Sequence, residues 1–262
     1  MIDEDSVNSL DRSLVTKAGY DHGWEVVVED AAEHLTLGSA NHAARATVRS
    51  AGAGVWAVSL PPGPVPAELA RVPEVRRAPE GAFLARDDRE LGALLAHAAR
   101  LARTLPDLPR QKFAQAVAAE LAVLGEGPSA TEVERLVRQR VGQDIYRESL
   151  FDYWGGACAV TGIALPELLR ASHTKPWAAC ASDAERLDVF NGFLLAAHLD
   201  ALFDRYLLTF DPAGLAVMSP RVDAFTRTRL GLTPDLRLRW LSPEHETYLA
   251  GHREEFARQI IV

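Results

Sequence analysis

Residues 158–204 read CAVTGIALPELLRASHTKPWAACASDAERLDVFNGFLLAAHLDALFD, and this stretch decides the fold of the C-terminal half. Cys158–Gly162 predicts a short strand entering a tight turn, and Leu169–His173 predicts a second strand, closed by the Lys-Pro-Trp sequence after it. His198–Asp204 predicts a helix. The order is therefore strand, strand, helix, with a histidine at the end of the second strand and carboxylates on the helix.

This arrangement suits hydrolysis of a phosphodiester bond. The reaction needs a base that takes a proton from water, and a divalent cation that stabilises charge on the phosphate and the leaving oxygen. A neutral imidazole such as that of His173 can be the base near pH 7. Asp200 and Asp204 lie one turn apart on the predicted helix. Carboxylates, with one imidazole, can hold a cation and leave positions open for phosphate and water.

Several motifs of this stretch, in their order, resemble the HNH endonuclease family, in the branch found in bacterial restriction enzymes. They are Cys-Ala-Val-Thr-Gly at 158–162, Ala-Ser-His-x-Lys-Pro-Trp at 171–177, Asn-Gly at 191–192 and His-Leu-Asp-Ala-Leu-Phe-Asp at 198–204. The resemblance extends upstream to Gln143–Arg147 and downstream to Tyr248–Glu254. It implies a DNA-cleaving hydrolase with a ββα-metal core, flanking helices and a divalent cation, with Mg²⁺ as the first choice and Mn²⁺ or another divalent ion as alternatives.

The resemblance also implies roles for single residues. His173 would be the general base, and Asn191 would be the central asparagine that braces the loop holding the base. Asp200 stands where many members of the family have the last, metal-binding histidine. His198, two residues earlier, and Asp204, one turn later, are further candidate metal ligands.

One position departs from the family pattern. Many HNH sites have an aspartate directly before the base, as a metal ligand, whereas this chain has Ser172. Ser172 could bind the cation through water, or the cation could rest on Asp200 and His198 alone. His198 could instead cap the preceding loop, and Asp204 could be a solvated helix residue or pair with Arg205.

Basic side chains are candidates for phosphate contacts. They are Arg147, Lys175 and Arg205 near the motifs, and Arg45 and Arg49 in the N-terminal part. Each of them could equally be an ordinary surface charge. The net charge of −8 argues against nucleic-acid binding when taken alone, but a basic patch can lie on an acidic body.

The rest of the chain predicts a β-rich part followed by helices. The strand candidates, separated by turn-prone glycines, are Trp24–Glu29, Leu35–Leu37, Ala46–Val48 and Val55–Leu60. The helix candidates run from Asp87 or Asp88 to Leu105, over Arg110–Leu124, from a capping box at Ser129–Glu132 to Val137, over Asp144–Trp154, and over Ser242–Ile260 with Ser242 as cap. We therefore expect an α+β protein with a recognition domain at 1–108 and a nuclease domain with a helical lead-in at 109–262.

Aromatic side chains of the N-terminal part suggest a base-reading pocket. Tyr20, Trp24 and Trp56 could stack on a flipped or modified base, with Asn41 on its edge. Core packing is the competing interpretation, because aromatic residues of small β domains usually lie in the core. β-rich readers joined to an HNH domain resemble modification-dependent restriction enzymes, so methylated adenine and methylated or hydroxymethylated cytosine are candidate marks.

Bulk properties exclude several classes of protein. Hydrophobic residues make up 48% and charged residues 24% of the 262 positions, an ordinary globular balance. The chain has no apolar run long enough to cross a bilayer and begins with acidic, polar residues, so we expect a soluble cytoplasmic protein without a membrane partner. Cys158 and Cys180 form no CxxC pair, which argues against a zinc ribbon, and Cys158 is expected to be a small buried residue.

The expected partner is double-stranded DNA, with methylated DNA as one alternative. A homodimer is plausible, because two paired active sites can cut both strands of a two-fold symmetric duplex. Two other functions stay open: a nuclease with a toxin or repair role, and a DNA-binding or regulatory protein whose HNH site has lost activity. Ser172 in place of aspartate makes the last of these possible.

Overall fold

The computed structural model describes residues 7–52, 54–105, 107–124 and 130–261. The chain forms two compact units, Met1–Pro106 and Asp107–Val262, which are described separately. Both combine helices with antiparallel strands, so the predicted α+β class is confirmed. Within the described residues, no helix is long and apolar enough to cross a membrane.

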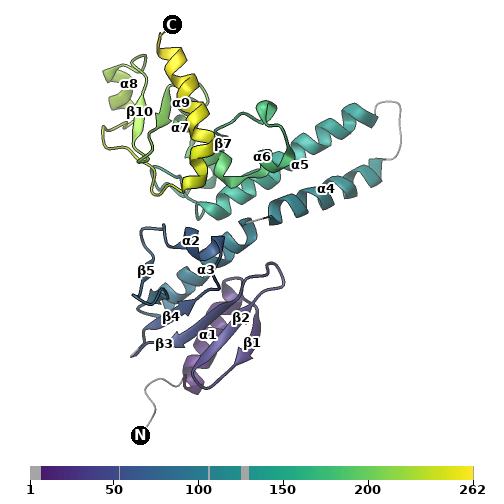
Figure 1. Ribbon diagram of the computed structural model, residues 1–262, viewed down its shortest axis with the longest axis vertical. Coiled ribbons are helices and arrows are strands. Elements are labelled where there is room, and N and C mark those ends of the chain that lie inside the picture. The colour runs from purple at the N-terminus through teal and green to yellow at the C-terminus, as the bar shows by residue number, and fades with distance from the viewer. Residues whose placement is uncertain (1–6, 53, 106, 125–129, 262) are drawn as a thin grey trace. The chain divides into compact units, whose positions relative to one another are not determined.

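The first unit contains a six-stranded antiparallel sheet in the order β1-β2-β3-β4-β6-β5 (Figure 1). Its strands are β1 (Val26–Asp30), β2 (His34–Gly38), β3 (Ala46–Ser50), β4 (Trp56–Ser59), β5 (Arg76–Arg77) and β6 (Phe83–Ala85). The four strands predicted between residues 24 and 60 are confirmed. β1 is an edge strand with all five residues exposed, so its three consecutive valines do not mark a buried face.

Three helices complete this unit: α1 (Ser9–Asp21), α2 (Pro64–Leu69) and α3 (Asp88–Thr104). α3 begins as predicted, because the Asp87 carboxylate caps it by accepting from the Glu90 N–H. Its leucines and alanines form a buried stripe, and the Trp24 indole donates to the Leu95 carbonyl at 2.8 Å. α1 was not predicted. It buries only two residues, Val15 and Gly19, and therefore lacks an apolar stripe.

The second unit begins with two helices packed side by side, α4 (Leu108–Leu124) and α5 (Ala130–Tyr153) (Figure 1). The prediction of separate helices at 129–137 and 144–154 is wrong, because α5 runs through both segments. Gly142 lies inside this helix where the Trp177 indole packs so closely that a Cβ atom would overlap it. Ser129 of the predicted capping box lies outside the described residues.

A strand–strand–helix element follows. β7 (Leu169–His173) pairs antiparallel with β8 (Gly192–Ala196), and α7 (Ala197–Phe203) comes directly after β8. The strand predicted at Cys158–Gly162 is wrong, because these residues form a turn. In it the Gly162 N–H donates to the Cys158 carbonyl, while the buried Cys158 sulfur accepts N–H groups of the turn and of Ala196.

The second unit also contains further helices and strands outside this strand–strand–helix element. They are η1 (Pro166–Leu168), η2 (Trp177–Ala179), α6 (Asp183–Leu187), η3 (Val189–Asn191), β9 (Leu208–Phe210), β10 (Ala216–Met218), α8 (Ala224–Arg229), η4 (Pro243–His245) and α9 (Glu246–Ile261). The closing helix predicted from Ser242 is confirmed, although its first turn is the 3₁₀ helix η4. Ser242 stands at the N-cap, but its hydroxyl donates to the Glu244 carboxylate instead of capping the backbone.

Candidate active site

His173 ends β7, opposite Gly192 on β8. Its half-buried imidazole stacks on the Tyr146 ring, with centroids 3.8 Å apart and planes 19° apart, and meets the edge of the Trp177 indole. Burial lowers the pKa of His173 to about 4, because a charged imidazolium loses its hydration there. His173 is therefore neutral near pH 7, the form that a general base needs.

Gly192 makes this stacking arrangement possible. A Cβ atom at residue 192 would overlap the Ser172 carbonyl and the Tyr146 hydroxyl. The Tyr146 hydroxyl occupies this space and donates to the Asn191 carbonyl at 2.9 Å. The Asn-Gly pair, which by itself predicts only a turn, is thus a point of close backbone approach beneath the histidine.

A backbone carbonyl sets the tautomer of His173. The Nε2 atom lies 3.0 Å from the carbonyl oxygen of Arg186. A carbonyl can only accept, so Nε2 must carry the proton in the neutral ring. The lone pair that can take up a proton is therefore on Nδ1.

Asn191 is fully buried and braces the segment between β7 and β8 at both of its ends. Its Oδ1 accepts from the Lys175 N–H at 2.8 Å, and its Nδ2 donates to the Glu185 carbonyl at 3.0 Å. Glu185 directly precedes Arg186, whose carbonyl orients the base. The asparagine thus fixes the backbone that holds His173.

The carboxylates of α7 lie near Ser172. The Ser172 hydroxyl, itself buried, donates to Oδ1 of Asp204 at 3.3 Å. Partial burial raises the pKa of Asp200 and of Asp204, and the Asp204 charge raises the pKa of Asp200 further. Two carboxylates one helical turn apart, both disfavoured as anions, form a group that a cation would stabilise.

One cavity of about 320 Å³ brings the base and a carboxylate together. It is lined by Ala171, His173, Thr174, Pro176, Trp177, Phe203, Asp204, Tyr206 and His252. The predicted base and one predicted ligand of the helix therefore face the same space. Asp200 and His198 do not line it.

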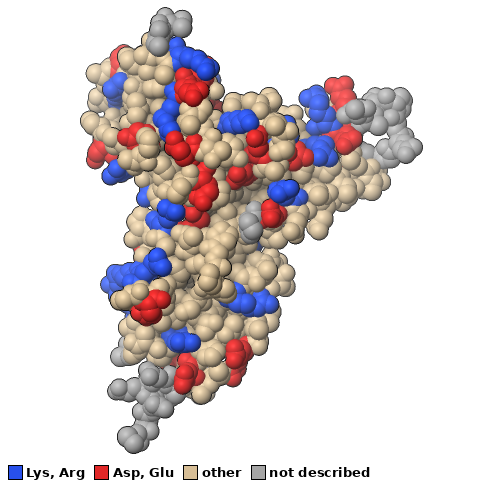
Figure 2. All heavy atoms as spheres, viewed as in Figure 1, with Lys and Arg blue, Asp and Glu red and all other residues tan. Residues whose placement is uncertain are grey.

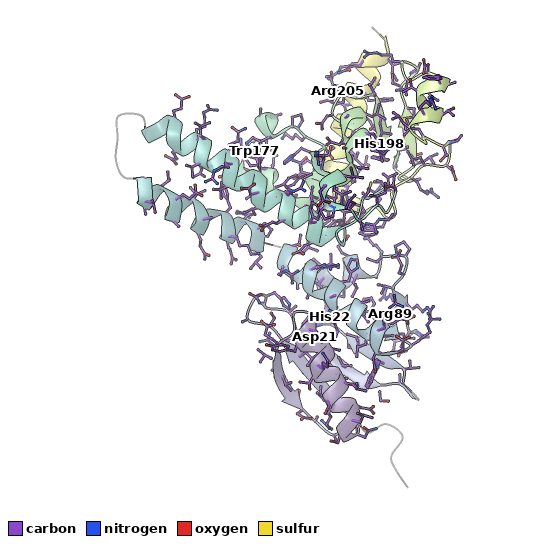
Figure 3. All side chains as sticks on the ribbon, turned by 180° about the vertical axis from the view of Figure 1, so that it is seen from behind. Asp21, His22, Arg89, Trp177, His198 and Arg205 are labelled. Atoms are coloured by element: carbon purple, nitrogen blue, oxygen red, sulfur yellow. The ribbon has the colours of Figure 1, made fainter. Side chains whose placement is uncertain are left out.

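His198 and Asp200 lie two residues apart on α7. Residues two apart on a helix point in different directions, whereas Asp200 and Asp204 share a face. Figure 3 labels His198 on α7 and Trp177 on η2. Helix spacing therefore favours Asp204 over His198 as the partner of Asp200, and the ligand role of His198 stays a prediction.

The donor set of α7 fits a hard cation. No three His, Cys, Asp or Glu side chains come together within the described ranges. Mg²⁺ does not need such a cluster, because it keeps several waters and binds through one or two carboxylates together with substrate phosphate. Asp200, Asp204 and the Ser172 hydroxyl supply oxygen donors of this kind.

The basic residues of this unit that are candidates for phosphate contacts differ in the protein groups that they already bind. Arg147 donates to the carbonyls of Leu169 and Pro166 and so holds the start of β7, which corrects its assignment to phosphate binding. Lys175 pairs with Glu185 at 2.7 Å. Arg205 is exposed beside the α7 carboxylates, and its guanidinium donates to the Ala201 carbonyl. On the face in Figure 2, acidic and basic side chains are interspersed.

The proposed base pocket of the first unit is corrected as well. Trp24 and Trp56 are 1% and 2% exposed, and the Trp56 indole donates to Asp88 at 3.0 Å. Both indoles belong to the core, so neither can stack on a base. Tyr20 is 70% exposed, and the Asn41 amide donates to Glu25. The exposed arginines on and beside β3 are Arg45 and Arg49.

Sequence reasoning missed several residues that build the site. Tyr146 lies in the upstream segment and His252 in the downstream segment of the resemblance, and neither was assigned a role. His252 is buried, with Nε2 3.1 Å from the Phe203 carbonyl and Nδ1 2.9 Å from the Thr209 hydroxyl, and it stacks on the Phe203 ring. It therefore fixes the C-terminal end of α7.

Comparison with known proteins adds one match. No curated protein matches the chain. Residues 158–211 match the model of a family described as HNH endonuclease. The matched range contains β7, β8, α7 and β9, and with them His173, Asn191 and both α7 carboxylates. Residues 158–211, in the C-terminal half of this chain, are thus similar to the HNH endonuclease family.

Proposed function

We propose that the protein is a metal-dependent DNA endonuclease of the restriction type. One observation carries the proposal: within a matched HNH domain, the neutral imidazole of His173 and the carboxylate of Asp204 line the same cavity. A base and a cation-binding group must lie this close for hydrolysis of a phosphodiester bond.

In the proposed reaction His173 removes a proton from water. Nδ1 accepts this proton, while Nε2–H stays on the Arg186 carbonyl and holds the ring in place. The water oxygen bonds to phosphorus, and the bond from phosphorus to one ester oxygen breaks. That oxygen leaves with the electron pair and takes up a proton from solvent. The negative charge of the bound phosphate opposes the effect of burial and stabilises the imidazolium that forms.

Asp200 and Asp204, with Ser172 beside them, would hold a divalent cation, either Mg²⁺ or Mn²⁺. When bound, the cation supplies positive charge that stabilises the phosphate and the leaving oxygen. Arg205 is the exposed basic candidate beside these carboxylates and is the natural contact for a neighbouring phosphate.

The first unit is the proposed recognition part. We assign recognition to residues 1–108 and cleavage to residues 109–262. Because Trp24 and Trp56 are buried, DNA would be read by exposed side chains, among which Arg45 and Arg49 suit phosphate contacts. A β-rich reader ahead of an HNH domain favours a modification-dependent enzyme that acts on methylated double-stranded DNA in the cytoplasm. A homodimer would supply two sites for the two strands.

Plasmid cleavage tests the proposal. Wild type and His173→Ala are incubated with Mg²⁺ or Mn²⁺ and with plasmid grown with or without adenine or cytosine methylases. His34→Ala, on β2 of the first unit, is the matched control and should cut as wild type does. Wild type should cut and His173→Ala should not. If both are inert on every plasmid, the endonuclease proposal fails and the alternative of a DNA-binding protein with an inactive HNH site remains. Equal cutting of all plasmids rejects modification dependence.

A further inference from the structure

Tyr206 has an unusual backbone conformation. It is the one non-glycine residue with positive φ, at 52°, in the part of the chain that the structure describes. It follows α7 in a Schellman arrangement, in which the Leu207 N–H donates to the Leu202 carbonyl and the Tyr206 N–H donates to the Phe203 carbonyl. Glycine is the usual residue at this position, because its lack of Cβ removes the steric penalty.

The helix would end in the same way with glycine, so helix termination does not explain a tyrosine. The Tyr206 ring is half-buried and lines the cavity that contains His173 and Asp204. It lies 4.8 Å from the His252 ring, which two hydrogen bonds hold in place. Among the described residues, no hydrogen bond of the Tyr206 hydroxyl is found, so this group is free to bind a ligand in the cavity.

Strained backbone at a functional cavity is a recurring sign of a group held for binding. Resting on the proposed function, we propose that Tyr206 binds the substrate directly: its hydroxyl donates a hydrogen bond to an oxygen of the DNA phosphate that His173-activated water attacks. The left-handed backbone directs the ring into the cavity, and His252 limits its movement. The ligand class is a phosphodiester of DNA, and Tyr206 aligns it without taking part in proton transfer.

Two substitutions separate this role from a structural one. Tyr206→Phe keeps the ring and removes only the hydroxyl, so folding stability should not change. Loss of a hydrogen bond to a charged phosphate should lower the single-turnover cleavage rate at saturating DNA about ten- to hundredfold, and weaken duplex binding several-fold. Tyr206→Gly removes the strain and the ring. It should melt at or above the wild-type temperature and be at least as inactive as Tyr206→Phe.

Phe225→Ala, an exposed ring on α8 outside the cavity, is the control and should keep wild-type cleavage. Wild-type cleavage by Tyr206→Phe or Tyr206→Gly overturns the role of Tyr206 and leaves the nuclease proposal intact. If wild type itself does not cut, the nuclease proposal fails, and binding of labelled duplex DNA decides the role of Tyr206. In that case weaker binding by Tyr206→Phe supports a phosphate contact, and unchanged binding overturns it.

Discussion

His173 and Asn191 are held by neighbouring carbonyl groups of α6. The Asn191 amide donates to the Glu185 carbonyl at 3.0 Å, and Nε2 of His173 lies 3.0 Å from the Arg186 carbonyl. A shift of this short helix would therefore change the orientation of the imidazole. The role of the asparagine is thus indirect: it fixes the backbone that fixes the base.

Asn191→Asp tests this relationship. The substitution keeps the side-chain shape but sets a carboxylate oxygen against the carbonyls of Glu185 and Lys175. We expect the free energy of unfolding to fall by about 2–4 kcal/mol, because a buried charge then faces two carbonyl oxygens that have lost their donor. The cleavage rate should fall more than about tenfold, because displacement of a catalytic group is costly. Urea unfolding and single-turnover cleavage below the unfolding transition measure the two effects.

Asn8→Asp is the matched control for that variant. Asn8 caps α1 by accepting from the Asp11 N–H, and aspartate is an equally good N-cap. Its stability should stay within about 0.5 kcal/mol of wild type. A destabilised Asn191→Asp that cleaves at the wild-type rate would show that the base does not depend on this brace.

The pH dependence of cleavage should report the burial of His173. Its pKa is lowered to about 4, so the imidazole stays neutral well below the ordinary histidine range. The pKa values of Asp200 and Asp204 are raised, so protonation of these two carboxylates also contributes to the loss of activity at acid pH. The acid limb of kcat/KM should therefore lie clearly below pH 6.5. A midpoint at or above pH 6.5, measured on short duplex DNA, would contradict a buried neutral base.

His252 should make folding stability depend on pH. Burial lowers its folded pKa to about 4, so the unfolded chain binds a proton at higher pH than the folded chain does. The contribution of neutral His252 to the free energy of unfolding is fully present above pH 6.5 and is lost as the pH falls towards 4. With about 1.36 kcal/mol per unit, the loss is of the order of 3 kcal/mol. Urea unfolding of His252→Phe should show a flatter dependence between pH 7 and 4.5, whereas Phe225→Ala, which removes an exposed ring without a titratable group, should keep the wild-type slope.

The sequence predicted the elements whose signals are local. β7 and α7 follow from closely spaced motifs, and α3 follows from the Asp87 cap and its leucine stripe. β8 was not predicted: the other strand of the pair was assigned to Cys158–Gly162, and the five buried residues of β8 show no alternation of apolar and polar side chains. α1 was missed because it has almost no buried face. The turn at Cys158–Gly162 was mistaken for a strand. The Cys158 sulfur stabilises this turn by accepting backbone N–H groups, and one of them, from Ala196, lies far away in the sequence. Such a tertiary contact cannot be recognised from the local sequence.

The sequence predicted which residues belong to the site, but not how their side chains are oriented. The motifs identified His173, Asn191 and the α7 carboxylates as candidates, but a backbone carbonyl such as that of Arg186 leaves no mark in a sequence. Arg147 was assigned to phosphate contact, because its charge is visible in sequence and its carbonyl partners are not. The prediction of a base pocket from Trp24 and Trp56 was wrong for the same reason. Their burial depends on the fold and is not visible in the sequence.

Two glycines should respond in opposite directions to alanine. Gly192→Ala places a methyl group on the Ser172 carbonyl and the Tyr146 hydroxyl, so we expect a loss of about 2–3 kcal/mol from overpacking. Gly251→Ala lies in α9 with open space around its Cβ and should gain about 0.5–1 kcal/mol from helix propensity. Denaturant unfolding of both variants checks the contrast, and equal stability would show that β8 can move away from Tyr146.

Cation binding should be visible without catalysis. Partial burial and mutual repulsion raise the pKa values of the two α7 carboxyls, so neutralising one of them removes an unfavourable charge. Without added metal, Asp200→Asn and Asp204→Asn should be at least as stable as wild type. Mg²⁺ or Mn²⁺ should raise the melting temperature of wild type, because a ligand that binds only the folded state stabilises it, and this rise should be lost in both variants. Glu254 is an exposed residue of α9, and the control variant Glu254→Gln should keep the metal-induced rise in melting temperature. A metal-induced rise that persists in both aspartate variants would place the cation elsewhere on the chain.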